Sequence, residues 1–197
     1  MKIAVIIVTF NGESVIKKCL SSVLESTVPV SVFVIDNASN DNTRKIISSF
    51  GNNVNLIENV RNEGFGAANN QMLSLTYNLG MDYFFLLNQD AWVESAAIDK
   101  LCLHLTNRKD ISVLSPLHID PESKKPESNF SHFTGLKTQV DITSKLNNGE
   151  SLYPVPLVNA AAWMISRKCL EEVGGFNPSF FHYGEDSNYA DRLLFHG

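Results

Sequence analysis

The sequence predicts an α/β fold in which a Rossmann-like, mostly parallel central sheet is flanked by helices. Three short apolar runs, residues 3–8, 32–35 and 84–87, each end in polar residues that are typical of turns. Continuous apolar runs of this length are typical of strands that are covered on both faces, as in a parallel sheet. Stretches with helical periodicity lie between the runs, so strand and helix alternate. This alternation indicates βαβ units with right-handed crossovers.

The remaining elements are predicted from the same periodicities. Residues 14–24 carry apolar side chains at i, i+1, i+4, i+5, i+8 and i+9, which form the stripe of an amphipathic helix. Residues 116–153 are polar and have no clear period, so we expect a long loop that is functional or mobile. Further helices are expected over 40–50, 66–79 and 94–106, from about Arg167 and over 185–196, and further strands over 54–58, 111–115 and 154–165.

Composition narrows the class of protein. The 197 residues suit one ordinary domain, and the net charge of −5 and pI near 5.5 give no reason to expect nucleic acid as a partner. No apolar stretch approaches the roughly 18–20 residues that span a bilayer. The N-terminal run lacks a signal-peptide cleavage site. The three cysteines are far apart and odd in number, which argues against a disulfide framework or a metal site, and a reducing cytoplasm is the simplest setting.

Polar side chains stand at the ends of three predicted strands: Thr9 and Asn11, then Asp36 and Asn37, then Asp90. Ligands of open parallel sheets bind beyond the carboxyl ends of the strands, so these side chains would converge on one crevice. A turn is the simpler explanation for any one of these positions, because Asx residues favour turns and caps, but three neighbouring strands that all end this way favour the shared crevice. No GxGxxG or P-loop follows the first strand, which disfavours a classical dinucleotide fold.

The loop NVRNEGFGAANNQM, residues 59–72, is the most distinctive segment. Gly64 and Gly66 permit backbone conformations that other residues resist, and they allow another molecule to approach closely. A helix that is predicted to start near Ala67 offers an N-terminus that favours anions, and Arg61 adds a positive charge suited to phosphate. An ordinary glycine turn before a helix is the alternative.

Carboxylates mark two further candidate positions. Asp90 could hold a divalent cation, because one carboxylate suffices for Mg²⁺ when phosphate and water complete its shell; capping the next helix is the alternative. Glu185 and Asp186 follow an aromatic, glycine-bearing loop, where adjacent acids can supply a general base. Their alternative role is that of first-turn residues favoured by the helix dipole. The five histidines show no metal-ligand spacing.

Five segments, read in order, resemble an inverting glycosyltransferase of the large bacterial family with the GT-A fold, family 2: VIIVTFNGESVIKKCLSSVLES, VIDNASNDNT, NEGFGAANNQM, LLNQDAWV and VGGFNPSFFHYGEDSNYADR. The match covers nearly the whole chain except residues 116–153. NEGFGAANN is most similar to the rhamnosyltransferase-like branch, which builds bacterial polysaccharides and O-antigens. The resemblance implies a dTDP- or UDP-sugar donor, a glycan or lipid-linked sugar acceptor, and a divalent cation, Mg²⁺ or Mn²⁺.

The resemblance also implies roles for the matching positions. Asn88-Gln89-Asp90 stands where the family carries its DxD motif, and Asp90 is the metal-binding member. Asp186 matches the catalytic base that deprotonates the acceptor hydroxyl, and Glu185 precedes it. The side facing the donor sugar and acceptor comprises Asn159, Ala161, Trp163 and Arg192. The nucleotide-sugar-binding positions are Thr9, Asn11 and Glu13 in the base pocket, Asp36 at base or ribose, Arg61, Asn62, Gly64 and Gly66 in the loop beside the nucleotide and diphosphate, and also Asn37, Asn69, Asn88 and Gln89.

Two positions depart from the family pattern. Asn88 replaces the first acid of DxD, which weakens the expected metal affinity but keeps a carbonyl oxygen in place. Asn188 replaces an acid that is often found two residues after the Glu-Asp pair. We expect one catalytic domain over residues 1–197, with a nucleotide-binding part over about 1–115 and an acceptor-side part over about 116–197. Its end one helix after the last motif predicts a C-terminally truncated domain.

The sequence therefore predicts a cytoplasmic glycosyltransferase that a lipid-linked acceptor would bring to the inner face of the membrane. The alternative is a nucleotide-sugar-binding domain with weak or no catalysis, which Asn88 and the early end of the chain favour. A nucleotidyltransferase of similar architecture is disfavoured, because its glycine-rich, lysine-bearing loop after the first strand is absent.

Overall fold

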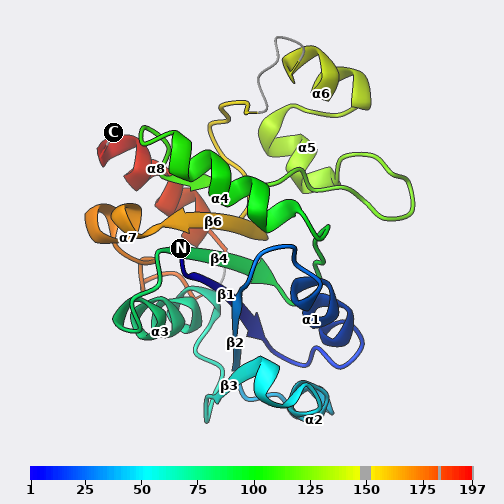
Figure 1. The fold of residues 1–197 in the computed structure, drawn as a ribbon, viewed down its shortest axis with the longest axis vertical. Coiled ribbons are helices and arrows are strands. Elements are labelled where there is room, and N and C mark those ends of the chain that lie inside the picture. Colours follow the sequence, from blue (N-terminus) through cyan, green and yellow to red (C-terminus); the bar gives the residue numbers. More distant parts are fainter. Residues whose placement is uncertain (147–151, 182, 197) are drawn as a thin grey trace.

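The computed structural model describes residues 1–146, 152–181 and 183–196, and it shows a six-stranded sheet with helices on both faces (Figure 1). The strands are β1 (Ile3–Thr9), β2 (Ser31–Asp36), β3 (Val54–Glu58), β4 (Tyr83–Asn88), β5 (Val113–Leu114) and β6 (Ala162–Ser166). The helices are α1 (Ile16–Leu24), α2 (Thr43–Ser48), α3 (Phe65–Asn78), α4 (Ala97–Asn107), α5 (Ser128–Thr134), α6 (Gln139–Leu146), α7 (Arg167–Val173) and α8 (Glu185–His196), with a short 3-10 helix, η1 (Gly51–Asn53), before β3.

The sheet has a parallel part and an antiparallel edge. Its strand order is β3-β2-β1-β4-β6-β5, in which β3, β2, β1 and β4 run parallel. β6 is antiparallel to β4, and β5 is antiparallel to β6. β1 lies between two parallel neighbours and is covered on both faces, which explains why its residues form a continuous apolar run. The predicted mostly parallel sheet is confirmed.

An apolar layer lies on each face of the sheet, because successive side chains of a strand point to opposite faces. In β1, Ala4 and Ile6 belong to one layer, and Val5 and Ile7 belong to the other. α3, α7 and α8 supply residues to the first layer, and α1, α2 and α4 supply residues to the second. The two layers pack against both faces of the parallel strands and so help to fix where their carboxyl ends lie.

The prediction of a structureless loop over residues 116–153 is wrong where its described part forms α5 and α6. The Glu127 carboxylate caps α5 by accepting hydrogen bonds from two first-turn amides at 2.9 and 3.0 Å. Gly135 ends this helix with a φ of +73°. Phe130 and Ile142 enter the first apolar layer. These helices are short, so their few apolar residues show no clear period in the sequence. Figure 1 shows them beyond the β6 side of the sheet.

The strand predicted over 154–165 is confirmed only in its C-terminal part, as β6. Pro154 and Pro156 have no amide hydrogen to donate to a neighbouring strand, so the chain before Ala162 is irregular. The strand predicted over 111–115 is reduced to the two residues of β5.

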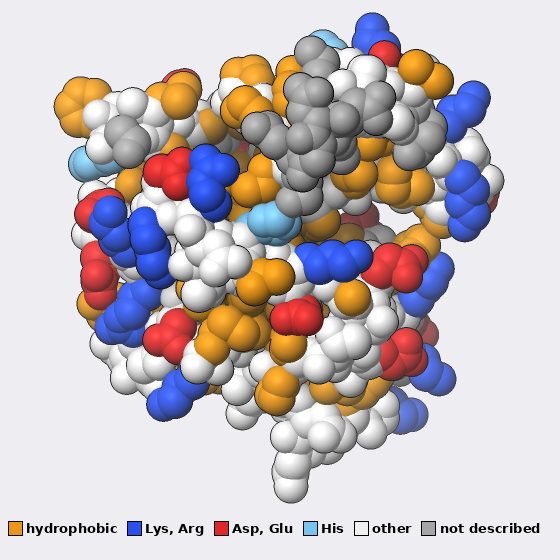
Figure 2. Space-filling view, turned by 45° about the horizontal axis from the view of Figure 1, so that its top comes forward, with side chains coloured by type: hydrophobic (Ala, Val, Ile, Leu, Met, Phe, Trp, Pro, Cys, Tyr) orange, Lys and Arg blue, Asp and Glu red, His pale blue; other side chains and the backbone are white. Residues whose placement is uncertain are grey.

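The surface charge, the cysteines and the lengths of the helices bear on the expectations from composition. On the face that Figure 2 shows, Lys and Arg side chains are interspersed with Asp and Glu, and apolar side chains reach the surface between them. Cys19, Cys102 and Cys169 are buried and not in disulfides. Among the described helices, none has the length and apolar character needed to cross a membrane.

Candidate functional site

The carboxyl ends of β1, β2, β3 and β4 lie side by side, and we call this row the strand-end edge. Thr9 is in register with Asp36, and Asp36 is in register with Glu58. On the other side of β1, Val8 is in register with Asn88. The polar residues that the sequence places at strand ends are therefore neighbours across the sheet, at the edge where ligands of open α/β sheets bind.

Asp90 and Asn88 present oxygen atoms that the protein itself does not use. The Asp90 side chain is exposed, and the Asn88 side chain is half-buried. Neither side chain makes a hydrogen bond or an ion pair within the described residues. A carboxylate and an amide carbonyl are hard oxygen ligands, so the chemistry of these two residues suits Mg²⁺ or Mn²⁺. No group of three or more His, Cys, Asp and Glu side chains suited to a metal ion is present in the described parts of the chain.

Cys19 lies beneath this end of β4, with its thiol donating to the Asn88 carbonyl at 3.5 Å. Burial raises the pKa of the Cys19 thiol to about 12, and the negative charge of Asp90 adds to the rise. The thiol therefore stays protonated at neutral pH, so this position offers packing and no thiolate nucleophile.

Gln89 joins the ends of β4 and β1. Its Oε1 accepts hydrogen bonds from the Thr9 hydroxyl at 2.5 Å and the Phe10 amide at 3.1 Å, and its Nε2 donates to the Phe10 carbonyl at 3.2 Å. A Cβ at Gly12 would collide with the Gln89 amide, so the glycine allows this contact. The polar atoms of Gln89 are thus engaged within the protein, and its nucleotide-binding role stays a prediction.

The turns after β1 and β2 are tied together by side chains of the predicted base pocket. Asn11, at a φ of +49°, accepts a hydrogen bond from the Asn40 amide at 3.0 Å. The Asn11 amide in turn donates to the Ser39 hydroxyl at 2.9 Å. Glu13 accepts from the Asn42 main chain at 3.1 Å and from its side chain at 2.8 Å. Asn11 and Glu13 therefore shape this pocket wall, and their contact with a nucleotide stays a prediction.

Asp36 has one occupied and one unoccupied carboxylate oxygen. Its side chain is fully buried, and its Oδ2 accepts from the Ser39 amide at 2.9 Å. The Arg44 Nε lies 3.8 Å from the same oxygen. Oδ1 is buried and has no hydrogen-bond partner. A buried acceptor without a partner costs stability unless a donor arrives, so Asp36 offers a place for a ligand N–H or O–H.

Asn37 organises the loop that precedes α3. Its Nδ2 donates to the Asn62 side chain at 3.1 Å and to the Gly64 carbonyl at 3.2 Å. Its Oδ1 accepts from Asn59 at 2.9 Å. Asn37 and Asn62 therefore hold the loop in shape. In the same loop, exposed Arg61 pairs with Glu63 at 2.7 Å and leaves one face open to solvent.

Gly64 lies at the end of this loop, and Gly66 and Asn69 lie in the first turns of α3. Gly64 has a φ of +85°, and a Cβ there would collide with the Phe181 carbonyl. A Cβ at Gly66 would lie 3.2 Å from the Phe176 Cβ. Buried Asn69 donates to the Phe65 carbonyl at 3.0 Å within α3. The close approach that the sequence assigns to a ligand at both glycines is thus made here by the segment before α8.

Glu185 and Asp186 begin α8, as predicted. Glu185 is 7% exposed, and its Oε2 is buried without a hydrogen-bond partner. Asp186 is half-buried, and one of its oxygens accepts from the Ser187 amide at 2.8 Å. Gly184, at a φ of +90°, makes the turn into the helix. Two acids in a first turn also suit the helix dipole, so the catalytic role stays a prediction.

The four acceptor-side residues occupy different environments. The Ala161 carbonyl accepts from the Asn88 amide at 2.9 Å, which places it against the strand-end edge. Asn159 is half-buried, and its Oδ1 has no hydrogen-bond partner. Trp163 is 2% exposed within the first apolar layer, and its Nε1 has no hydrogen-bond partner. The Arg192 guanidinium donates to main-chain carbonyls at the end of α7. Only Ala161 of this group is joined to the strand-end edge by a hydrogen bond.

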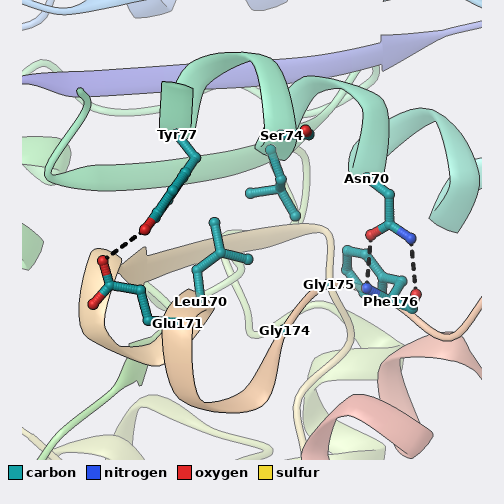
Figure 3. Close-up of a pocket in the computed structure, with 9 residues that line it drawn as sticks. Asn70, Ser74, Tyr77, Leu170, Glu171, Gly174, Gly175 and Phe176 are labelled. Atoms are coloured by element: carbon teal, nitrogen blue, oxygen red, sulfur yellow. Dashed lines mark hydrogen bonds between the residues drawn. The ribbon is translucent and has the colours of Figure 1, made fainter. Parts of the chain in front are cut away.

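A pocket of about 410 Å³ lies between α3 and α7, away from the predicted chemistry (Figure 3). None of the predicted site residues lines it. Asn70 stands at one end and hydrogen-bonds to Phe176. Asn69 has a predicted role in nucleotide-sugar binding, and Asn70 has none. The only signal for Asn70 is its place in NEGFGAANN, since the contact joins residues 106 positions apart.

Comparison with known proteins identifies one matching family. The model for "Glycosyl transferase family 2" matches residues 4–174. The chain is 26% identical to the low-salt glycan biosynthesis hexosyltransferase Agl10 of Haloferax volcanii over 196 residues, which cover 96% of this chain and 61% of that protein. It is 25% identical to an N-acetylglucosaminyl-diphospho-decaprenol L-rhamnosyltransferase of Mycobacterium tuberculosis, covering 96% of this chain and 69% of the relative.

A third relative and two solved structures agree with this classification. The dTDP-rhamnosyl transferase RfbF of Shigella flexneri is 24% identical, with 98% of this chain and 63% of that protein covered. S. aureus TarS residues 1–349 superpose with a TM-score of 0.72 at 18% identity, covering 100% of this chain and 56% of that one. The mannosyltransferase PcManGT of Pyrobaculum calidifontis, solved with GDP-Man and Mn²⁺, gives 0.69 at 17% identity, covering 98% and 51%. The GT-A fold is thereby shown, and the chain spans 61% to 69% of the lengths of the three curated relatives.

Proposed function

Because the chain belongs to glycosyl transferase family 2, we propose that it transfers a sugar from a dTDP- or UDP-linked donor to an acceptor hydroxyl in the synthesis of a polysaccharide, O-antigen or cell-wall glycan. The relatives named as hexosyl- and rhamnosyltransferases support this class of reaction. TarS solved with UDP-GlcNAc and PcManGT solved with GDP-Man support a nucleotide-diphospho-sugar as the donor.

The observation that carries the proposal is the pair of unused oxygen ligands at the strand-end edge. Asp90 and Asn88 make no side-chain bonds within the described protein, although their neighbour Gln89 makes three. Side chains that are left free beside a fully bonded residue are suited to an external ligand. A divalent cation held there would offset the negative charge of the departing nucleoside diphosphate. Buried Asp36, with its unpartnered Oδ1, would accept a hydrogen bond from the base or ribose of the same donor.

Asp186 is proposed as the general base. It takes the proton of the acceptor hydroxyl while that oxygen attacks the anomeric carbon and the bond from this carbon to the diphosphate breaks. Attack from the face opposite the leaving group inverts the configuration of the sugar. The Ser187 amide donates to one Asp186 oxygen and leaves the other for the acceptor proton. Glu185 lies beside Asp186, and its buried Oε2 has no hydrogen-bond partner, which supports a second polar contact with the acceptor.

Donor binding is the direct test of the proposed substrate class. We would measure thermal unfolding of this chain with UDP-, dTDP- and GDP-sugars, each with and without Mn²⁺. A true donor stabilises the folded state by mass action, with about 2.7 kcal/mol expected at a concentration of 100 times Kd. We expect a dTDP- or UDP-sugar to raise Tm most, and more so with Mn²⁺. The absence of a shift with every nucleotide would refute the proposal.

The base is tested by Asp186→Asn, which keeps the shape of the side chain and removes its proton-accepting charge. We expect transfer to fall by a factor of about 100 to 10,000, the range typical of losing a general base. Donor binding in the thermal assay should stay unchanged. Full transfer activity in this variant would show that another group takes the proton.

A donor-binding domain with weak or no catalysis is the second candidate. Asn88 favours it, because an amide in place of the first DxD acid lowers the negative charge available to a cation. This candidate predicts a thermal shift with a donor but no release of nucleoside diphosphate. Measurable transfer by this chain would eliminate it. If the acceptor is lipid-linked, as the name of the mycobacterial relative indicates for that protein, we propose that the chain works at the inner face of the membrane.

A further inference from the structure

The side chain of Asn70 pairs with the main chain of Phe176 in both directions. Its Oδ1 accepts from the Phe176 amide at 2.7 Å, and its Nδ2 donates to the Phe176 carbonyl at 2.8 Å (Figure 3). A primary amide that uses both of its polar ends on one residue fixes the position and the orientation of that residue. Asn70 sits on α3, directly after the loop at the strand-end edge, and Phe176 opens the segment that leads to α8.

Glycines on both sides make this contact possible. A Cβ at Gly175 would collide with the Asn70 Oδ1 and lie 3.0 Å from its Cγ. A Cβ at Gly66, one turn before Asn70, would press on the Phe176 Cβ at 3.2 Å. Farther along, Gly64 gives room to the Phe181 carbonyl. Gly66 of NEGFG therefore lies against Phe176 of VGGF, and Gly175 of VGGF lies against Asn70, so the two motifs form a single contact.

The Phe176 ring anchors the same point from inside. It is 2% exposed and lies 5.2 Å from the Tyr189 ring of α8 and 6.3 Å from the Trp163 ring of β6, measured between centroids. The Tyr189 hydroxyl also donates to the Gly174 carbonyl at 3.1 Å. The chain just before and at Phe176 is thus held by α3 on one side and α8 on the other.

We propose that Asn70 is a positioning residue: by fixing Phe176, it sets the path of residues 176–181 and so the place of Glu185 and Asp186 relative to the strand-end edge. This inference rests on the proposed role of Asp186 as the base. It assigns the second Asn of NEGFGAANN to the acceptor side of the reaction, through a segment far away in the sequence. A misplacement of about 1 Å at a reacting group can lower the rate by about 100-fold.

The test uses four variants of this chain: Asn70→Ala, Asn70→Asp, Gly175→Ala and the double variant Asn70→Ala with Gly175→Ala. Asn70→Asp keeps the acceptor for the Phe176 amide and places an oxygen against the Phe176 carbonyl. Ser74→Ala is the matched control, because Ser74 lies one turn farther along the same pocket wall and its exposed side chain makes no hydrogen bond within the described protein.

Three quantities are measured. Exchange of the Phe176 amide hydrogen, followed by NMR, reports the contact itself. The affinity for dTDP with Mn²⁺ reports the donor half. The kcat for release of dTDP from dTDP-rhamnose, with water taking the place of the acceptor hydroxyl and receiving the sugar, reports the chemical step. Release of UDP from UDP-GlcNAc is measured in the same way as a second donor. For Asn70→Ala we expect faster exchange, a dTDP affinity within twofold of the wild type, and a kcat lower by about 10- to 100-fold. Asn70→Asp should lie between Asn70→Ala and the wild type, and the Ser74→Ala control should match the wild type.

The double variant separates positioning from general weakening. Introduced alone, Gly175→Ala should lower kcat, since its methyl group displaces the Asn70 amide. In the Asn70→Ala background the same change should have little further effect, because nothing remains there to displace. An unchanged kcat in Asn70→Ala with faster Phe176 exchange would overturn the proposal, and so would unchanged exchange. If the wild type turns over neither donor, the proposed function fails, whereas an active wild type with an equally active Asn70→Ala refutes only the role of Asn70.

Discussion

Replacing Gln89 with Ala tests whether the ends of β4 and β1 are joined as described. The change removes three hydrogen bonds, of which two involve the main chain of exposed Phe10 and are replaced by bonds to water. The third is different, because the Thr9 side chain is fully buried and its hydroxyl donor is left without a partner. Such a group costs about 1–3 kcal/mol. We therefore expect Gln89→Ala to lower the free energy of unfolding by about 2 kcal/mol, which corresponds to a drop in Tm of about 4–8 °C.

The free energy of unfolding is measured by urea denaturation, with the fluorescence of buried Trp163 as the signal. Gln71→Ala is the matched control, because exposed Gln71 makes no hydrogen bond within the described residues, and its change should stay within about 0.5 kcal/mol of the wild type. In a Thr9→Val background, Gln89→Ala should cost clearly less, since no hydroxyl is left unpaired. A cost below 0.5 kcal/mol for Gln89→Ala alone, or strict additivity with Thr9→Val, would refute this account of the joined strand ends.

Two other predictions concern metal dependence and pH. Asn88→Asp restores a second carboxylate at the strand-end edge and should lower the Mn²⁺ concentration needed for half-maximal donor stabilisation, by about tenfold at most since the site stays solvated; an unchanged Mn²⁺ titration would place Asn88 outside the coordination shell. Burial lowers the pKa of His118, although the Glu127 charge opposes the shift. Because the unfolded chain then binds the proton more readily, His118 stabilises the fold fully above pH 6.5, and this contribution is lost as pH falls through the lowered folded pKa. His118→Gln should therefore flatten the fall in Tm between pH 7 and pH 5, and an identical fall in both proteins would contradict the assignment.

The predictable part of this fold follows from strong local patterns. β1 and β4 are apolar because they are buried on both faces of the sheet, and burial of that kind appears directly in the sequence. The sequence pattern does not predict α5 and α6, because each helix is short and is stabilised by caps and a few core contacts. Caps such as that of Glu127 consist of one residue, so they contribute little to any periodic signal.

The site was predictable in its location but not in the use of each side chain. The sheet alone brings Thr9, Asp36 and Asn88 together, because parallel strands end at a common edge. Which of these side chains are free depends on contacts between residues far apart in the sequence. Gln89 bonds across 80 positions to Thr9, and this pairing could not be read from LLNQDAW.

The donor side and the acceptor side of the proposed site each depend on one side-chain amide that bonds to main chain far away in the sequence. Gln89 joins β4 to β1 and so holds Asp90 at the strand-end edge, where the donor is proposed to bind. Asn70 joins α3 to Phe176 and so directs the segment that carries Asp186. Both amides use their donor and their acceptor on the main chain of a single residue, and each needs a neighbouring glycine, Gly12 or Gly175, to reach it. Since the two sets of bonds share no residue, the two sets of variants should act independently. Loss of the Gln89 contacts should weaken Mn²⁺-dependent donor binding, whereas loss of the Asn70 contacts should lower kcat alone. The double variant should show the same loss of donor affinity and the same loss of kcat as the two single variants.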